Sequence, residues 1–377
     1  MICGWPLRRL DRCAKFLSGG TPRKAVAEFW AGDIPWVSSG EMTQTRIHDT
    51  PLRITTEAAR AGSRLVPANT VLAVVRGMSL ANEFRIAIAK REVAFNQDLK
   101  AFACVPDVEP EFLFYSLFAH RENIRELATE ASHGTKKLET QVLANFQIPV
   151  PCVNVQRRAI SAIASYDDLI ENNRRRMALL EKAARLLYEE WFVRLRFPGH
   201  ERARITDGVP AGWERVPLGE RVTLNYGKAL KAEDRVDGPF LVYGSSGVVG
   251  SHDEPLTRGP GVILGRKGNV GSVFWSSRDF HAIDTVYYVD AETSNLYLFY
   301  ALKHMHFIST DVAVPGLNRE FAYSRPLLLP AGGVLRRFLD VVSPIREQLD
   351  RLEEINCRLR AARDLLLPRL MSGEIAV

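Results

Sequence analysis

The sequence lacks the features of a membrane or secreted protein. It contains no run of about 18 apolar residues and no apolar stretch near its start followed by a small-residue cleavage site, so we expect neither a membrane span nor an export signal. The cysteines are odd in number and form no CxxC pair, which argues against a disulfide framework and a zinc site. They are Cys3, Cys13, Cys104, Cys152 and Cys357. We therefore expect a cytoplasmic protein without a membrane partner.

The motifs of common enzymes are also absent. The sequence has no GxSxG elbow, no HExxH helix, no double-proline loop of amino-methyltransferases and no complete PD–(D/E)xK nuclease pattern, of which Pro106-Asp107 is only an isolated start. Glycines recur every third residue over 244–250 and 265–271, but among strand-like residues, which indicates hairpin turns rather than phosphate loops. His304 and His306 would point to different faces of a helix, so they do not suggest a metal site. We expect a non-catalytic chain that binds no metal or cofactor.

Composition and length predict a folded protein with two globular units. Hydrophobic residues make up 46% of the 377 residues and charged residues 25%, which is typical of globular proteins. The length exceeds that of one average domain. The formal net charge of +6 permits a polyanionic partner but does not require one.

The sequence contains an internal duplication. The segment that begins at Pro151 aligns without a gap with the segment that begins at Pro330. Identical pairs are Val155/Val334, Arg157/Arg336, Arg158/Arg337, Leu180/Leu359, Ala183/Ala362, Leu186/Leu365 and Leu187/Leu366. A second echo relates Trp5 and Leu10 to Trp213 and Leu218. The chain is therefore predicted to alternate between globular units and helices. The expected segments are a domain at 1–150, a helix at 151–197, a turn-rich linker at 198–212, a domain at 213–329 and a helix at 330–377.

The two duplicated segments have the heptad spacing of coiled-coil helices. In the first, the a and d positions hold Ile163, Tyr166, Ile170, Asn173, Met177, Leu180 and Leu187, together with Ala184 and Trp191. In the second, they hold Val342, Ile345, Leu349, Leu352, Asn356, Leu359 and Leu366, with Leu370, and Arg363 interrupts the series. Two long copies in one chain favour an intramolecular pair over ordinary core packing. Pro344 predicts a kink or a delayed start of the second helix.

The globular units are predicted to be α+β with twisted sheets. Short β-like runs lie at Ile34–Val37, Thr70–Val75, Gly261–Leu264 and Thr285–Val289. Short helices are expected near Glu111–Ala119 and Leu296–Lys303.

Over nearly its whole length the sequence resembles the specificity subunits of type I restriction-modification systems. The most specific parts are the run from Leu187 to Val193 with Arg196–Gly199, the opening Gly212-Trp213 with Leu218-Gly219, and the ending Leu367–Ile375. The stretch Gly19–Pro22 before Ile34–Val37 also looks like the family's target recognition domains. The resemblance implies two tandem α/β target recognition domains, separated by two long antiparallel coiled-coil helices and related by a pseudo-twofold axis.

The resemblance also implies function and partners. Each recognition domain would read one half of a bipartite, asymmetric site in double-stranded DNA, and the helices would set the spacer. Two modification (methyltransferase) subunits would dock on this chain, and restriction/translocase subunits would join them. S-adenosylmethionine, ATP and Mg would bind to those partners and not to this chain.

Residues that read bases are expected to be basic or polar and to lie on exposed loops. The candidates are Arg76, Lys136 and Lys137 in the first domain and Lys228, Tyr243, Arg266, Lys267, Asn269, Asn318 and Arg319 in the second. Arg76 and Arg266 both follow an apolar strand and precede a glycine, so we expect them to be equivalent. The alternative for each is an ordinary solvated side chain.

The charge distribution bears on how tightly the chain would hold DNA. The two helical segments carry four of the six net positive charges, so the recognition domains are nearly neutral. We therefore expect weak DNA binding by the chain alone and tight binding within the complex. The run Arg174–Arg176 is either a solvated helix face or a contact to a partner subunit or phosphate.

Two other readings stay open at the level of sequence. One is an enzyme: either a fused restriction-modification polypeptide, for which the duplication leaves no length for a methyltransferase domain, or a nuclease whose motif is not recognisable in the sequence. The other is a coiled-coil adaptor whose domains bind peptides rather than DNA.

Overall fold

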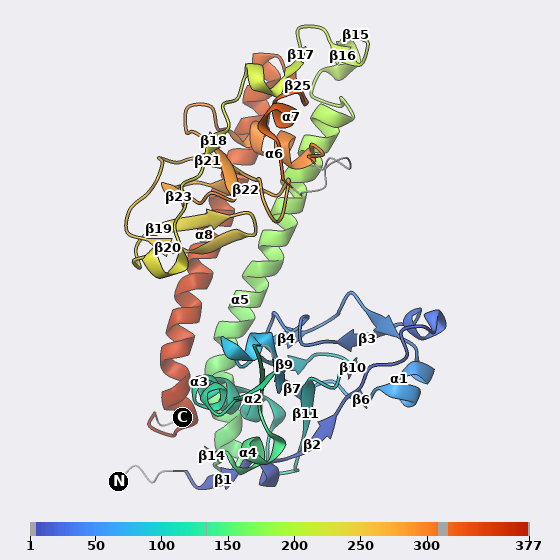
Figure 1. Ribbon diagram of the computed structural model, residues 1–377, viewed down its shortest axis with the longest axis vertical. Helices are drawn as coiled ribbons and strands as arrows, with labels where there is room; N and C mark the ends of the chain where they lie inside the picture. Colours follow the sequence, from blue (N-terminus) through green and yellow to red (C-terminus); the bar gives the residue numbers. More distant parts are fainter. Residues whose placement is uncertain (1–4, 133, 308–315, 376–377) are drawn as a thin grey trace. The chain divides into compact units, whose positions relative to one another are not determined.

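The computed structural model describes residues 5–132, 134–307 and 316–375, and Figure 1 shows its helices and strands. The chain divides into two compact units by its internal contacts. Unit 1 comprises the chain up to Glu171 together with the segment from Asn356 onward, and unit 2 comprises Asn172–Ile355. Two long helices, α5 (Val153–Tyr188) and α8 (Gly332–Met371), each contribute one part to each unit. A unit is therefore a globular part plus parts of both helices.

Unit 1 is built on a five-stranded sheet in the order β2-β11-β7-β9-β4, antiparallel except for the β4–β9 pair. Its strands are β2 (Ala14–Ser18), β4 (Arg46–Ile47), β7 (Val71–Val74), β9 (Ile86–Ala89) and β11 (Leu99–Cys104). A second sheet has the order β5-β3-β10-β6, with strands β3 (Ile34–Val37), β5 (Arg53–Ile54), β6 (Leu65–Val66) and β10 (Val93–Phe95). Two smaller sheets are formed by β1 (Leu7–Arg9) with β14 (Gln147–Pro149), and by β8 (Arg76–Gly77), β12 (Thr129–Ser132) and β13 (Thr135–Lys137).

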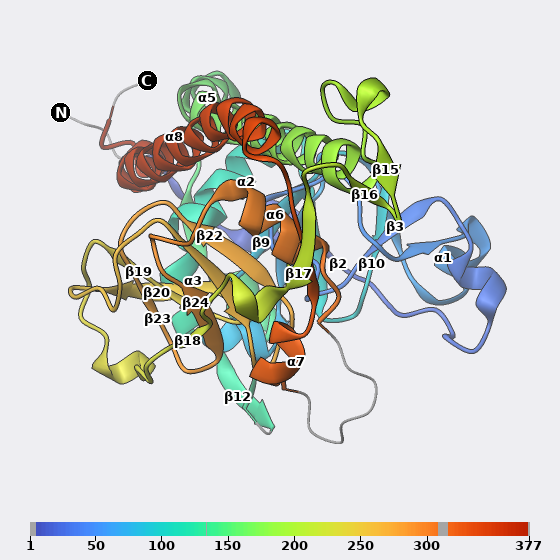
Figure 2. The same cartoon turned by 90° about the horizontal axis from the view of Figure 1, so that it is seen from above.

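The core of unit 1 explains its apolar sequence runs. All four residues of β7 are buried, as expected for a central strand covered on both faces. Helix α2 (Pro110–Ala119) contacts β7 and β9 and buries its residues 112–117. Figures 1 and 2 show α2 beside β9. The shorter helices are α1 (Thr56–Gly62), α3 (Arg121–Glu126) and α4 (Thr140–Asn145).

Unit 2 has a four-stranded antiparallel sheet in the order β18-β24-β21-β22. Its strands are β18 (Asn225–Tyr226), β21 (Gly261–Gly265), β22 (Val273–Ser276) and β24 (Val286–Val289). The other strands form the sheets β20-β19-β23, β17-β25 and β15-β16, and they are β15 (Ile205–Thr206), β16 (Val209–Pro210), β17 (Glu214–Pro217), β19 (Phe240–Gly244), β20 (Gly247–His252), β23 (Phe280–Ala282) and β25 (Pro326–Leu329). The helices are α6 (Leu296–His304), which contacts β22, and α7 (Arg319–Tyr323).

The two units share one plan. In each, an antiparallel core occurs in matching order, β2-β11-β7-β9 in unit 1 and β18-β24-β21-β22 in unit 2. In each, the opening strand pairs with the strand just before the long helix, β1 with β14 and β17 with β25. Leu10 and Leu218, which follow these opening strands, are both fully buried. The sequence echo between Trp5–Leu10 and Trp213–Leu218 therefore reflects the same local structure.

The long helices bury their heptad faces inside each unit. Unit 1 packs Ile163 of α5 and Leu367 of α8 into one core, and unit 2 packs Ala184 of α5 and Phe338 of α8 into another. Within unit 1 the start of α5 therefore meets the end of α8, and within unit 2 the end of α5 meets the start of α8. All the predicted a and d residues are buried or half-buried.

The expectations for Pro344 and for the two glycine series have different outcomes. The helix α8 begins at Gly332 and passes through Pro344, so a late start is wrong. The ring of Pro344 is exposed, and buried neighbours such as Phe338 and Val342 hold this part of α8 in place despite the missing hydrogen bond. The hairpin interpretation of the two glycine series is confirmed, because β19 pairs with β20 and β21 with β22, and Gly247, Gly268 and Gly271 have positive φ.

In the described parts of the chain, no helix is long and apolar enough to cross a membrane.

Candidate nucleic-acid interface and helix contacts

The structure brings the three candidates of unit 1 together on one small sheet. Lys137 lies opposite Arg76, and Lys136 lies opposite Gly77, in the antiparallel pairing of β13 with β8. The backbone N–H of Leu138 donates to the carbonyl oxygen of Val75 at 2.8 Å, and the buried Leu138 side chain anchors the strand in the core. Arg76 is exposed, while Lys137 pairs with Glu139 at 2.6 Å. Arg76 and Lys137, 61 positions apart in the sequence, thus lie opposite each other, and with the adjacent Lys136, whose side chain alternates to the other face, they form the basic strip of unit 1.

An exposed apolar residue also belongs to this strip. Met78 directly follows β8 and is 74% exposed, although Leu80 two residues later is fully buried. Gly77 between Arg76 and Met78 has φ of 144°, a conformation that suits glycine and re-aims the chain at this point. Sequence reasoning missed Met78 because nothing in the pattern distinguishes it from a core methionine.

Unit 2 carries a different arrangement, an alternating ladder of tyrosine rings and guanidinium groups. Arg266 lies over the rings of Tyr226 and Tyr287, with its Cζ 5.0 and 5.6 Å from the ring centroids. Arg319 lies over Tyr226 and Tyr323 at 5.1 and 5.9 Å. Each such contact is worth about 0.5–1 kcal/mol when exposed and more when desolvated. Both predicted arginines therefore converge on Tyr226, which is 50% exposed.

The ladder is anchored through the backbone on both sides. The Nη1 of Arg266 donates to the carbonyl oxygen of Asp284 at 3.2 Å, and the carbonyl oxygen of Arg266 accepts from the N–H of Leu317 at 2.8 Å. The hydroxyl of Tyr287 donates to the carbonyl oxygen of Leu317 at 3.1 Å. Burial raises the pKa of Tyr287, and its contact with Tyr226 adds to the effect. These bonds join the end of β21 to the segment just before α7.

The remaining candidates of unit 2 have varied positions. Lys267 and Asn269 are exposed in the turn between β21 and β22, and Lys267 pairs with Asp284 at 3.6 Å. Lys228 is exposed after β18. Asn318 is exposed but caps α7, since its Oδ1 accepts from the N–H groups of Glu320 and Phe321.

The expectation that every candidate lies on an exposed loop is wrong for Tyr243, and it holds only in part for the half-buried Lys136, Lys137, Arg266 and Arg319. Tyr243 is only 6% exposed, in β19, and its ring packs at 5.7 Å against that of Phe280. The second half of β19 is buried at successive residues, Val242 to Gly244, with a register shift at Tyr243, so the whole strand end lies in the core. Sequence reasoning selected Tyr243 beside a glycine turn, and it missed Tyr226, which stands beside Gly227 in the same kind of context.

In unit 1 the long helices are joined by a buried polar network. The Nη1 of Arg363 in α8 donates to Oδ1 of Asp167 in α5 at 2.6 Å, and the hydroxyl of Tyr115 in α2 donates to Oδ2 of Asp167 at 2.9 Å. Arg363 and Asp167 are 9% and 7% exposed, and Arg363 also lies over the ring of Phe118. Burial and then the charge of Asp167 raise the pKa of Tyr115, which keeps its hydroxyl protonated as the donor. The break in the heptad at Arg363 is therefore an interhelix ion pair.

In unit 2 the helices are joined by aromatic rings instead. Phe338 of α8 is fully buried and lies 4.9 Å from the ring of Phe192 at an interplanar angle of 85°. Tyr188 at the end of α5 contacts Phe192, and its burial raises its pKa. The π-helical turn Glu189–Val193 that follows α5 places Phe192 at the centre of this cluster. Each ring pair adds about 0.5–1.5 kcal/mol beyond its buried area.

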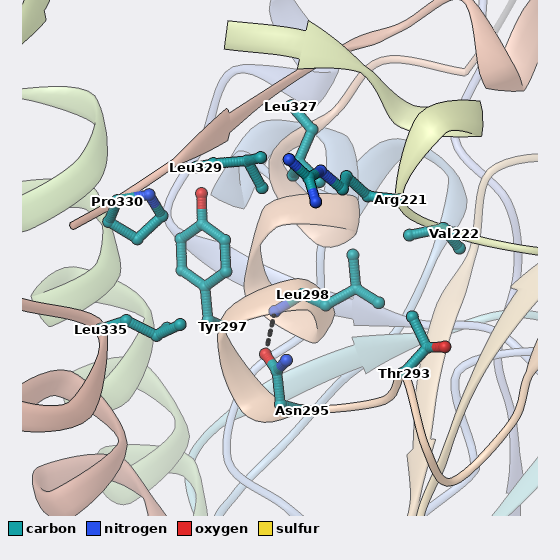
Figure 3. Close-up of a pocket in the computed structure, with 10 residues that line it drawn as sticks. All are labelled: Arg221, Val222, Thr293, Asn295, Tyr297, Leu298, Leu327, Leu329, Pro330 and Leu335. Atoms are coloured by element: carbon teal, nitrogen blue, oxygen red, sulfur yellow. Dashed lines mark hydrogen bonds between the residues drawn. The ribbon is translucent and has the colours of Figure 1, made fainter. Parts of the chain in front are cut away.

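The pocket in Figure 3 does not have the character of a catalytic site. It lies between α6, the end of β25 and the start of α8, and it is lined mainly by Val222, Leu298, Leu327, Leu329, Pro330 and Leu335. Its polar residues serve the fold, since Oδ1 of Asn295 caps α6 by accepting from the N–H of Leu298 at 2.9 Å. Across residues 5–132, 134–307 and 316–375, no group of three or more metal-binding side chains occurs.

Known proteins with similar sequences share one description. The model of the type I restriction modification DNA specificity domain matches residues 3–182. The chain is 25% identical over 411 residues to the type I restriction enzyme MjaIX specificity subunit of Methanocaldococcus jannaschii, an alignment that covers 99% of this chain and 94% of that protein. A type I restriction enzyme specificity subunit of Escherichia coli is 30% identical over 164 residues, which are 43% of this chain and 41% of that protein.

A solved structure agrees at the level of the fold. The crystal structure of the S subunit of a type I restriction-modification system from M. genitalium superposes with a TM-score of 0.58 and 18% identity, covering 97% of this chain and 96% of that chain. The family match and the relatives confirm the resemblance predicted from the sequence, and the solved structure agrees with it in fold alone. Residues 3–182 thus match the type I restriction modification DNA specificity domain, and nearly the whole chain is similar in sequence to a type I restriction enzyme specificity subunit.

Proposed function

We propose that this chain is the DNA-reading subunit of a type I restriction-modification complex, without catalytic activity of its own. Its two target recognition domains, at 1–150 and 213–329, each read one half of a bipartite site in double-stranded DNA. The observation that carries the proposal is the shared plan of the two units with different residues at equivalent positions. Arg76 lies two residues after the end of β7 and Arg266 directly follows β21, the strand at the matching place in its sheet, and the side chains around these two arginines differ.

The difference between the two sites supports an asymmetric DNA target. The strip of unit 1 combines Arg76, Lys136 and Lys137 with the exposed Met78, whereas the ladder of unit 2 alternates arginine with tyrosine. Direct readout depends on which donors, acceptors and apolar groups face the base edges. Two different sets of groups select two different half-sites.

In this proposal the helical segments at 151–197 and 330–377 form an antiparallel coiled coil that sets the length of DNA between the two half-sites. The linker at 198–212 connects the first helical segment to the second recognition domain. The burial of the a and d residues within each unit, and the opposite direction of the helices there, support the coiled coil. Helix α5 has 36 residues, which corresponds to roughly 54 Å at 1.5 Å per residue. One turn of DNA is about 34–36 Å, so an unread spacer of several base pairs separates the half-sites.

The partners supply the chemistry. Two modification subunits dock on the helices, bind S-adenosylmethionine and flip and methylate the target adenine, and restriction subunits use ATP and Mg. The nearly neutral recognition domains make DNA affinity depend on the assembled complex, because counterion release scales with the number of phosphates contacted.

The test is to co-express the chain with its neighbouring modification subunit and to map methylated adenines by sequencing. An asymmetric bipartite motif with a fixed gap is the expected result. A complex that assembles but methylates nothing would contradict the proposal and favour the adaptor. A parallel binding titration with the chain alone is expected to give weak, strongly salt-dependent binding.

A further inference from the structure

The ladder in unit 2 has one guanidinium group that lacks its own hydrogen-bond partner. The Nε of Arg319 is buried and has no hydrogen bond within the described part of the chain. By contrast, Arg266 already spends one N–H on the carbonyl oxygen of Asp284. A buried donor without an acceptor costs about 1–3 kcal/mol, so its persistence needs a reason.

The surroundings of Arg319 fix its plane while they leave its Nε without an acceptor among the described residues. Its guanidinium lies 5.1 Å from the ring centroid of Tyr226 and 5.9 Å from that of Tyr323. Stacking on aromatic faces leaves the N–H edge of a guanidinium available in the plane of the group. The backbone of Arg319 is fixed as well, because it begins α7 directly after the capping residue Asn318.

Such a pre-oriented guanidinium is suited to one feature of DNA in particular. An arginine donates two parallel hydrogen bonds to O6 and N7 of guanine in the major groove, a contact that requires the plane of the group to match the base. An arginine can also donate two parallel hydrogen bonds to a phosphate, but a phosphate contact carries no sequence information, whereas the contact to guanine selects one base. The half-exposed ring of Tyr226 contacts both Arg319 and Arg266, so the two guanidinium groups belong to one stack.

We propose that Arg319 is a specificity-determining residue of the second recognition domain, that it reads a guanine in the half-site bound by unit 2, and that Tyr226 is its positioning residue. This inference rests on the proposed function. The arginine donates to the base edge, and the ring of Tyr226 holds the guanidinium in plane. Arg266 supports the ladder from its other side through Tyr287.

Arg319→Lys is the decisive variant because it keeps the positive charge and removes the planar fork. In complex with the modification subunit, we expect methylation at the native motif to fall at least about tenfold and one position of the unit 2 half-site to lose its guanine preference. The half-site read by unit 1 stays unchanged and serves as an internal reference. Tyr226→Phe keeps the ring and is expected to retain the motif, whereas Tyr226→Leu is expected to relax the same position as Arg319→Lys.

Arg278→Lys is the matched control. Arg278 lies in the same unit but follows β22, at the opposite edge of the sheet from β18 and Tyr226, and it pairs with Glu354 at 3.5 Å. Circular dichroism and co-purification with the modification subunit establish that each variant folds and assembles.

The outcomes separate the inference from the proposed function. If wild-type complex methylates a bipartite motif and Arg319→Lys leaves both rate and motif unchanged, the guanine contact is wrong. A uniform loss with the motif intact in Arg319→Ala, restored by Arg319→Lys, would identify a phosphate contact and would equally overturn it. If the wild-type complex binds no DNA, the proposed function fails and this inference falls with it.

Discussion

The two units solve the same packing problem in different ways. Both must attach a globular α+β part to one stretch of α5 and one stretch of α8. Unit 1 uses a buried ion pair, Arg363 with Asp167, completed by Tyr115, whereas unit 2 uses interlocking rings around Phe338. Aromatic packing is favourable in several relative positions of the rings. A buried ion pair adds little net stability, but any arrangement that leaves one of its charges buried without the other is strongly unfavourable. We infer that the ion pair of unit 1 fixes the alignment of α5 with α8, and that the rings of unit 2 contribute more to the free energy of packing the helices together.

The largest expected effect is the loss of the aromatic centre of unit 2. Phe338→Ala removes a fully buried ring that lies within 6.5 Å of five other rings. We expect the free energy of unfolding of unit 2 to fall by about 3–5 kcal/mol, through the cavity and the lost ring contacts. Hydrogen exchange of the chain would locate the loss of protection in residues 172–355. Equal loss in both units would show that they do not unfold separately.

The ion pair in unit 1 gives the next prediction. Arg363→Ala leaves Asp167 buried with only the hydroxyl of Tyr115, and is expected to cost about 3–5 kcal/mol. The triple variant Tyr115→Phe, Asp167→Leu and Arg363→Met removes all three polar groups and is expected to recover most of the stability. Denaturant titration of both variants measures the difference. A triple variant as unstable as Arg363→Ala would contradict this account of the network.

A smaller effect is expected at the reading site of unit 1. Arg76→Ala removes an exposed guanidinium from β8, so stability should change by less than about 0.5 kcal/mol. Methylation by the complex should weaken about 5- to 100-fold and lose preference at one position of the unit 1 half-site only. Motif mapping measures both halves in one experiment. A change confined to the unit 2 half-site would reverse the assignment of the two sites.

The sequence predicted much of the fold because duplication and periodicity are local patterns. Heptad spacing identified the helical segments, and the structure buries their a and d residues. Side-chain partners across long sequence distances were out of reach: no pattern relates Asp167 to Arg363, so the latter was interpreted only as an interruption. Among the candidate DNA-binding residues, Arg76 lies opposite Lys137 because of the register between β8 and β13. Arg266 and Arg319 stack on the same ring because a backbone hydrogen bond joins Leu317 to Arg266. Tyr243 and Tyr226 both precede a glycine, and the packing of their strands, which no local pattern shows, decides which ring is buried.

Cysteine labelling is the comparison of the two units with the smallest expected effect. Because residues 172–355 contain no cysteine, the labelling reports on unit 1 alone. Burial raises the pKa of Cys13 to about 11 and that of Cys104 to about 12, whereas Cys152 and Cys357 are exposed. Since the thiolate is the reactive form, iodoacetamide at pH 8 should label Cys152 and Cys357 well before Cys13 and Cys104, as read by peptide mass spectrometry. Because the pKa of each buried thiol is higher in the folded than in the unfolded state, its contribution to the free energy of unfolding is fully present below about pH 9. That contribution is lost as pH rises toward 11, since the thiols of the unfolded chain ionise first. Phe338→Ala should leave the slow labelling of Cys13 unchanged, and Arg363→Ala should accelerate it. Acceleration by both variants would show that the two units open together.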